Sequence, residues 1–223
     1  MIKIITFTSV IVMAITFLSF GIKSISSNDS EKIIPQNSIK LLPPEKSGGM
    51  PLMEALNKRH SSRNISSKKI TDQELSNLLW AAFGISRDES GKRTAPTAND
   101  TRAMDVYVIM ENGTYMYSAD DHSLIQVTDK DLRKLAGKQD FVYTAPVNLV
   151  YVADYSKLKE GSDKEVYSGA HAGFIGENVY LYCTSAGLGT VIRAWVDKEA
   201  LAKEMGLKEN QKIILAQTVG YTE

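Results

Sequence analysis

The stretch Lys58-Arg59-His60-Ser61-Ser62-Arg63 organises the interpretation of this chain of 223 residues. It follows a short helical pattern at Met50–Leu56 and gathers two guanidinium groups, an imidazole and two hydroxyls, with no acidic side chain among them. Arginine offers forked N–H donors and serine a short hydroxyl donor, a combination suited to an anion and above all to a phosphate. The alternative is a solvated basic turn, and the cluster alone does not decide between the two.

The composition is that of an ordinary globular protein with one principal domain. Hydrophobic residues make up 43% of the chain and charged residues 23%. Lys+Arg and Asp+Glu both count 26, so the formal net charge is zero and there is no electrostatic footprint for nucleic acid. The sequence therefore predicts no nucleic-acid partner.

The single cysteine and the three histidines predict neither a disulfide nor a metal site. Cys183 lies inside an apolar helical pattern, where a buried inert thiol is expected rather than a nucleophile. The histidines are scattered and none stands at metal-binding spacing from another ligand.

The N-terminus reads as a separate segment. Lys3 is followed by the uncharged run Ile4–Phe20, the pattern of an export signal, with Ser24 and Ser26 as small residues near a cleavage point. An uncleaved membrane anchor is the alternative. We therefore predict an export signal or anchor at residues 1–26 and a periplasmic location, or one on the outer face of the cytoplasmic membrane.

Residues 27–49 are rich in Ser, Asn, Pro, Lys and Gly and predict a linker, so the globular domain is expected at residues 50–223. Within the domain, helices and strands alternate around a small antiparallel meander, which indicates a mixed α+β class. The predicted helices after the first are 71–83, 129–136, 166–186 and 198–205. The predicted strands are 105–110, 115–118, 123–127, 146–153, 190–196 and 212–219.

Three separated stretches could bind one flat, phosphorylated ligand. Arg59–Arg63 would take the phosphate, the turn Ala95–Asn99 would meet the edge of a heterocycle, and Gly189–Ala194 would face its ring. No Gly-x-Gly-x-x-Gly follows a strand, and no Walker-type loop or Gly-x-Ser-x-Gly elbow occurs. Rossmann, nucleotide-hydrolase and serine-hydrolase functions have no support.

These stretches resemble the FMN-dependent nitroreductase superfamily. Arg59-His60-Ser61-Ser62-Arg63 is similar to its phosphate-binding signature. Leu78–Ile85 and Thr94–Asn99 resemble its branch of azoline-forming peptide dehydrogenases, and Ala186–Val191 is similar to the segment that passes beside the isoalloxazine ring. The resemblance implies a mostly antiparallel sheet flanked by helices, in an intertwined homodimer with FMN at the subunit interface. It implies no catalytic side chain, and the expected cofactor-binding residues are Arg59, His60, Ser61, Arg63, Pro96, Thr97, Asn99, Val191, Ile192, Arg193 and Ala194.

The chain departs from the family pattern in two places. Many members carry Glu-Gly beside the flavin where this chain has Arg193-Ala194, and many have a C-terminal extension with a phosphate-binding basic residue. The expected function is an exported, FMN-dependent oxidoreductase that transfers electrons in a ping-pong cycle to a small organic acceptor. Two alternatives remain: a dehydrogenase of a peptide-derived heterocycle, and an exported binding protein that kept the fold and lost FMN.

Overall fold

The computed structural model describes residues 37–223. The predicted export signal or anchor at residues 1–26 lies outside the described residues, as does the predicted linker before residue 37. Among residues 37–223, no helix has the length and apolar character needed to span a membrane.

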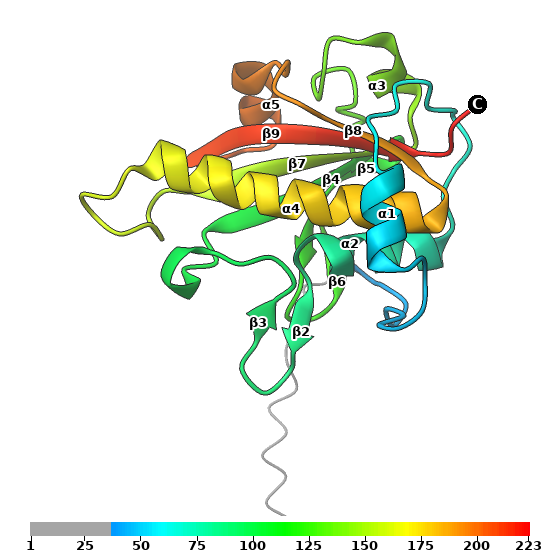
Figure 1. The fold of residues 1–223 in the computed structure, drawn as a ribbon. Helices are drawn as coiled ribbons and strands as arrows, with labels where there is room; N and C mark the ends of the chain where they lie inside the picture. The colour runs from blue at the N-terminus through cyan, green and yellow to red at the C-terminus, as the bar shows by residue number, and fades with distance from the viewer. Residues whose placement is uncertain (1–36) are drawn as a thin grey trace, which may run out of the picture. The chain divides into compact units, whose positions relative to one another are not determined.

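A seven-stranded sheet in the order β1-β6-β5-β4-β7-β9-β8 forms the centre of the domain, and each neighbouring pair is antiparallel (Figure 1). Its strands are β1 Ser38–Lys40, β4 Met104–Met110, β5 Gly113–Ser118, β6 Ser123–Thr128, β7 Val147–Asp154, β8 Gly189–Arg193 and β9 Gln211–Gly220. A separate hairpin pairs β2 Ile85–Arg87 with β3 Lys92–Arg93. The mixed α+β class with a mostly antiparallel sheet is confirmed.

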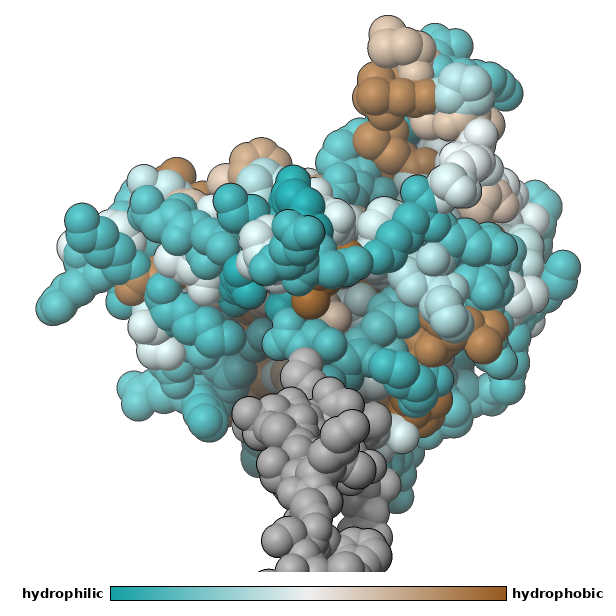
Figure 2. Space-filling view, turned by 90° about the horizontal axis from the view of Figure 1, so that it is seen from below, coloured by the Kyte–Doolittle hydropathy of each residue, from teal (hydrophilic) through white to brown (hydrophobic). Residues whose placement is uncertain are grey.

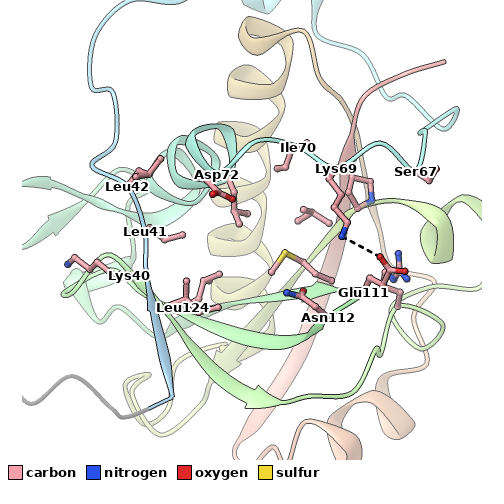
Figure 3. Close-up of a pocket in the computed structure, with 16 residues that line it drawn as sticks. Lys40, Leu41, Leu42, Ser67, Lys69, Ile70, Asp72, Glu111, Asn112 and Leu124 are labelled. Carbon is pink, nitrogen blue, oxygen red and sulfur yellow. Dashed lines mark ion pairs between the residues drawn. The ribbon is translucent and has the colours of Figure 1, made fainter.

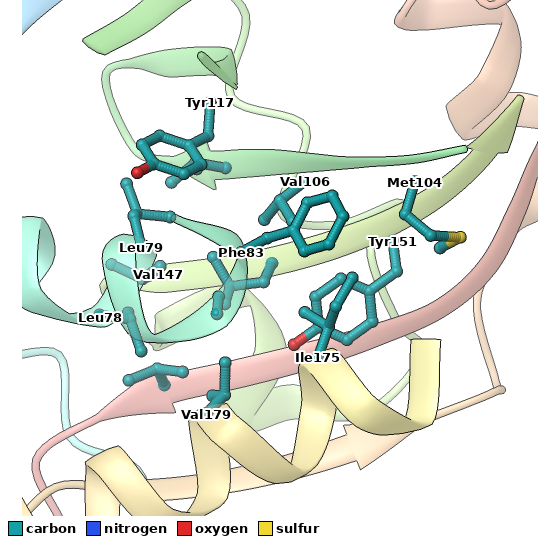
Figure 4. Close-up of a cluster of buried hydrophobic side chains, with 14 of the residues drawn as sticks. Leu78, Leu79, Phe83, Met104, Val106, Tyr117, Val147, Tyr151, Ile175 and Val179 are labelled. Carbon is teal, nitrogen blue, oxygen red and sulfur yellow. The ribbon is translucent and has the colours of Figure 1, made fainter. Parts of the chain in front are cut away.

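Helices cover both faces of the sheet. One face carries α2 Asp72–Phe83 and α4 Lys164–Ala186, with α1 Leu52–Lys58 beside α4; the other carries α3 Asp140–Thr144 and α5 Lys198–Glu204 (Figure 1). Successive strand residues point to opposite faces, so Tyr151 of β7 packs with Ile175 of α4 while Val152 joins the core under α5 (Figure 4). Because both faces are covered, β7 is apolar almost throughout.

Local sequence signals account for several element ends. Thr71 and Glu74 form a capping box at the start of α2, with the Glu74 N–H donating to the Thr71 hydroxyl at 3.1 Å. Gly187 ends α4 in the left-handed conformation, with φ of 71°. Cys183 is fully buried, as predicted.

Two predictions of local structure are wrong. Residues 129–136 form turns instead of a helix, and the helix of this region is α3, further along the chain. The Asp131 carboxylate accepts from the Arg133 backbone N–H at 3.1 Å, an amide group that a helix would pair with residue 129. The Ala136 carbonyl, which a helix ending there would leave unpaired, accepts from Arg193 at 2.7 Å.

The second correction concerns the predicted linker at 27–49. Its residues Ser38–Lys40 form the edge strand β1, paired with β6, so sheet structure begins before Met50. A strand of three residues is too short to show the alternation that identifies longer strands.

Candidate functional site

The basic segment 58–63 runs from the end of α1 to the edge of β8. The Arg59 N–H donates to the Ala55 carbonyl at 2.8 Å and closes α1, after which the chain becomes extended. The Ser62 N–H then donates to the Thr190 carbonyl at 2.9 Å. A side chain at Gly189 would not fit here, because its Cβ would lie 2.5 Å from the Thr222 Cγ2 and 2.8 Å from the Ile65 Cδ1, with the Ser62 Cβ at 3.0 Å. Two of the three predicted stretches are thus brought together.

Tyr180 of α4 joins these two stretches, and the sequence analysis did not identify it. Its hydroxyl lies 2.8 Å from the Ser61 Oγ and accepts from the Ile192 N–H at 3.0 Å. The Arg59 guanidinium lies over its ring, 5.2 Å from the centroid. A tyrosine in an apolar helix is usually core; only tertiary contacts reveal that this one links the cationic segment to the β8 edge.

The cations of the segment are available to an anion. Arg59 is half-buried and Arg63 exposed, and neither forms an ion pair within residues 37–223. His60 is exposed, with its Nδ1 2.9 Å from the Lys58 carbonyl. This arrangement of unpaired guanidinium groups beside the Ser61 hydroxyl fits a phosphate.

The predicted ring-lining residues of β8 do not all face one way. Ile192 packs against α4, where its Cδ1 lies 2.5 Å from the position of a Cβ on Gly176. Val191 and Arg193 alternate with it and turn to the opposite face, both buried. Ala194 follows the strand and is exposed. Of the four predicted ring-lining residues, only Ile192 and Ala194 could therefore contact a ligand directly on the side of the sheet that faces α4.

The third predicted stretch is held by a different residue of α4. The Ala98 N–H donates to the His171 Nε2 at 2.8 Å, and the Thr97 hydroxyl accepts from the Arg102 N–H at 3.1 Å. Pro96 and Asn99 beside them are exposed. His171 is 1% exposed, and burial lowers its pKa, which keeps the ring neutral so that Nε2 can accept. Its Nδ1 has no hydrogen-bond partner among the described residues.

The two anchor points on α4 lie on opposite flanks of the helix. His171 and Tyr180 are nine positions apart, about two and a half helical turns and roughly 13 Å along the axis. Side chains separated by a half-integral number of turns project in opposite directions. Within one chain, therefore, residues 96–99 do not converge with Arg59–Arg63 and β8 on one ligand.

A cavity of about 320 Å³ lies elsewhere, between β1, the start of α2 and the β4–β5 turn (Figure 3). Its walls include the apolar Leu41, Ile70 and Leu124, and the Lys69–Glu111 ion pair spans 3.7 Å beside it. None of the predicted cofactor-binding residues lines it. Among the described residues, no group of three His, Cys, Asp or Glu side chains could hold a metal ion.

Comparison with known proteins gives consistent matches. The sequence model of the Nitroreductase family matches residues 56–221. A protein of Methanocaldococcus jannaschii, named as a candidate nitroreductase, is 36% identical over 161 residues, which cover 66% of this chain and 81% of the relative.

Solved structures agree with these matches. A crystal structure of a candidate nitroreductase from Ralstonia eutropha JMP134 is 42% identical, with a TM-score of 0.80 over 84% of this chain and 90% of that one. The E. coli microcin synthetase McbBCD complex has a TM-score of 0.67 at 19% identity, over 93% and 85% of the two chains. That identity is low enough to show the fold alone.

Proposed function

The chain belongs to the nitroreductase family, an oxidoreductase class, and we propose that it binds FMN between two copies of itself and passes electrons to a small organic acceptor. The observation that carries this proposal is the contact of Tyr180 with both Ser61 and Ile192. It fixes the cationic segment beside the free edge of β8, where a ligand with a phosphate at one end and a ring at the other can span both.

Each stretch of the chain has its own task in this proposal. Arg59 and Arg63 bind the phosphate, and the Ser61 hydroxyl donates a hydrogen bond to it. The Tyr180 hydroxyl keeps the Ser61 side chain and the Ile192 backbone in fixed positions relative to each other. FMN supplies the electron-transfer chemistry when bound, and the protein binds, orients and tunes it. Arg59 and Ser61 are therefore expected to determine affinity and not the chemistry itself.

A homodimer explains why the third stretch lies across α4. Residues 96–99 cannot reach the Arg59–Arg63 side within one chain, but a second copy packed along α4 could present its own residues 96–99 there. The outward side of α4 suits such packing, because a Cβ at Gly169 or Gly173 would meet no atom within 4 Å in the single chain. Small residues let another backbone approach closely.

Exposed apolar side chains support the same contact surface. Leu52, Met53 and Leu56 of α1 are 62%, 76% and 45% exposed. Figure 2 shows hydrophobic residues gathered on the projecting part of the surface at its upper right. On α4, Tyr167 and Phe174 are also exposed. Exposed apolar patches of this kind mark interaction surfaces.

The reaction cycle is expected to be ping-pong, since one site would serve both half-reactions. A donor reduces the cofactor and leaves before the acceptor enters. The acceptor is expected to be a small organic molecule; dehydrogenation of a peptide-derived heterocycle is the competing assignment, in which the heterocycle would lose two electrons and two protons and the electrons would pass to the oxidised cofactor. Two measurements separate these cases: reoxidation of the reduced protein by a quinone or a nitroaromatic compound, and reduction of the oxidised protein by a peptide that carries an azoline ring.

Export remains part of the proposal, on the strength of Lys3 and the uncharged run Ile4–Phe20. Outside the cytoplasm NAD(P)H is not supplied, so the donor would be a quinone, a protein or another reduced carrier. Fractionation of cells expressing the full chain tests this. Recovery of the protein in the cytoplasmic fraction alone would overturn the assignment.

The visible spectrum of the purified full chain tests the central proposal. Bands of oxidised flavin that bleach with dithionite are expected, either directly or after addition of FMN and desalting. A protein that stays colourless after that treatment would overturn the proposal and favour an interaction protein that kept the fold without the cofactor.

A further inference from the structure

Arg193 carries a buried positive charge that has no acidic partner among residues 37–223. Its side chain is 6% exposed and donates to the Ala136 carbonyl at 2.7 Å, to the Asn148 Oδ1 at 3.1 Å and to the Thr218 Oγ1 at 2.7 Å. All three acceptors are uncharged. Within residues 37–223 the guanidinium forms no ion pair, and its Nε has no hydrogen-bond partner.

The surrounding chain is adapted to this side chain. A Cβ at Gly137 would collide with the Arg193 guanidinium, so the glycine makes the necessary room. Thr218 also donates to the Asn148 Oδ1 at 2.6 Å, which completes a small polar network on the face of the sheet that carries α3 and α5. Burial lowers the pKa of Arg193 to about 10, so the group remains a cation at neutral pH.

Burying a cation without a counter-ion is unfavourable, even when neutral acceptors surround it. A neutral side chain at position 193 could also attach residues 136–148 to the sheet, so attachment alone does not explain the charge. The position of Arg193 indicates a function that would explain why a buried cation is kept. Arg193 directly follows Ile192, whose backbone N–H faces Tyr180 at the proposed cofactor edge.

We propose that Arg193 is a fixed positive charge that raises the reduction potential of the bound flavin. The inference rests on the proposed function, since it requires FMN at the β8 edge. Reduction adds two electrons and one proton at neutral pH, so the reduced ring carries one more negative charge than the oxidised ring. A cation held in the low-dielectric interior favours the more negative form. Arg193 therefore acts through its charge from the far side of the strand, without touching the reacting atoms.

The midpoint potential of FMN bound to the full-length protein, measured against redox dyes, tests this role. Arg193→Met removes the charge and keeps an unbranched side chain, and reduced FMN is expected to lose about tenfold more affinity than oxidised FMN. For a two-electron couple that ratio corresponds to a potential lower by about 30 mV. Arg193→Lys keeps the charge and is expected to stay near the potential of the unaltered protein.

Asn148→Asp provides a second test that retains Arg193. It places a carboxylate beside the guanidinium, and the potential is expected to fall in the same direction as in Arg193→Met. An unchanged potential in a folded, FMN-loaded Arg193→Met protein would overturn the inference and leave only a structural role. If Arg193→Met does not fold, an unchanged or higher potential in Asn148→Asp overturns it. Failure of the unaltered protein to bind FMN would instead overturn the proposed function.

Discussion

The two flanks of α4 differ in how firmly they hold the residues attached to them. On one flank, the Tyr180 hydroxyl meets both Ser61 and Ile192, and the close approach at Gly189 packs the segment onto β8. On the other flank, the His171–Ala98 hydrogen bond holds a loop with positive φ at Asn99, Asp100 and Arg102. Asn and Asp adopt positive φ more readily than other non-glycine residues, whereas it is uncommon for an arginine such as Arg102.

We expect the two flanks of α4 to have separate roles in ligand binding. A preorganised surface binds a ligand without losing further conformational entropy, which suits the phosphate end of a cofactor. Among the described residues, the other hydrogen bonds of residues 97–102 are to one another and to Ser90, so the loop is joined to α4 through the single His171 bond. A loop attached in this way adjusts more readily, which suits the part of the site that admits varied acceptors. Variants on the Tyr180 flank should therefore change cofactor affinity, whereas variants on the His171 flank should change stability and acceptor preference.

Arg59→Ala is expected to have the largest effect, because it removes charge-assisted hydrogen bonds to the phosphate. Such bonds contribute about 1.5–3 kcal/mol, so FMN affinity should fall by roughly 10- to 100-fold. Titration of FMN fluorescence against the apoprotein measures it. Lys203→Ala, which removes an equal charge from the exposed end of α5, is the control. Equal FMN affinity in Arg59→Ala and the unaltered protein would remove the basic segment from the site.

Tyr180→Phe tests whether the attachment of the basic segment to β8 depends on a single hydroxyl group. It leaves the Ile192 N–H and the Ser61 hydroxyl without their partner, a loss of about 1.5 kcal/mol, and FMN affinity should fall about tenfold. Calorimetric titration with FMN measures the change.

Tyr182→Phe is the matched control for that variant. The Tyr182 hydroxyl donates to the Glu74 carbonyl at 3.2 Å, toward α2 and away from β8. It is therefore expected to alter stability and not FMN affinity. Equal losses of affinity in the two variants would show that the effect is general to α4, and the contrast between its flanks would disappear.

The sequence could predict features that depend on neighbouring residues. The predicted helices 71–83 and 166–186 occur, and the Thr71–Glu74 capping box and the left-handed Gly187 at their ends involve only neighbouring residues. Features decided by distant partners could not be predicted. The Ala136 carbonyl accepts from Arg193, more than fifty positions away, and nothing in the sequence around residues 129–136 indicates that partner. The role of Tyr180 likewise depends on Ser61 and Ile192, which the fold brings to it.

The position of residues 96–99 within the fold also could not be predicted from the sequence. Its residue types suit the edge of a heterocycle, and the sequence order places it with the other two stretches. The sequence does not show that His171 anchors it on the far flank of α4. That placement depends on how α4 lies on the sheet, which follows from the buried stripe that includes Ala172, Ile175 and Val179.

The His171 flank is expected to make stability depend on pH. Burial lowers the pKa of His171 below its ordinary value near 6.5. The unfolded chain then binds a proton more readily than the native protein. The contribution is fully present above pH 6.5 and declines as the pH falls toward the native pKa, by at most about 1.36 kcal/mol per pH unit.

Urea unfolding between pH 7.5 and 5.5 compares this dependence in the unaltered protein and in His171→Gln. The variant should show the shallower decline. His122, whose pKa burial also lowers, remains as a second contributor, and His122→Gln controls for it. Parallel curves for His171→Gln and the unaltered protein would mean that His171 does not contribute to the pH dependence.

Gly173→Ala should have the smallest effect and should act oppositely on the single chain and on the dimer. In the single chain an added Cβ meets no atom within 4 Å, and alanine favours a helix over glycine by about 0.8–1 kcal/mol, so the folded chain should gain stability. If a second copy packs its backbone along this side of α4, the same methyl group should weaken self-association. Sedimentation velocity over a concentration series, together with urea unfolding, separates the two effects. A variant that is more stable and associates as strongly as the unaltered protein would show that the partner does not approach α4 at Gly173. Residues 96–99 of the second copy would then have to approach the cofactor from a different direction.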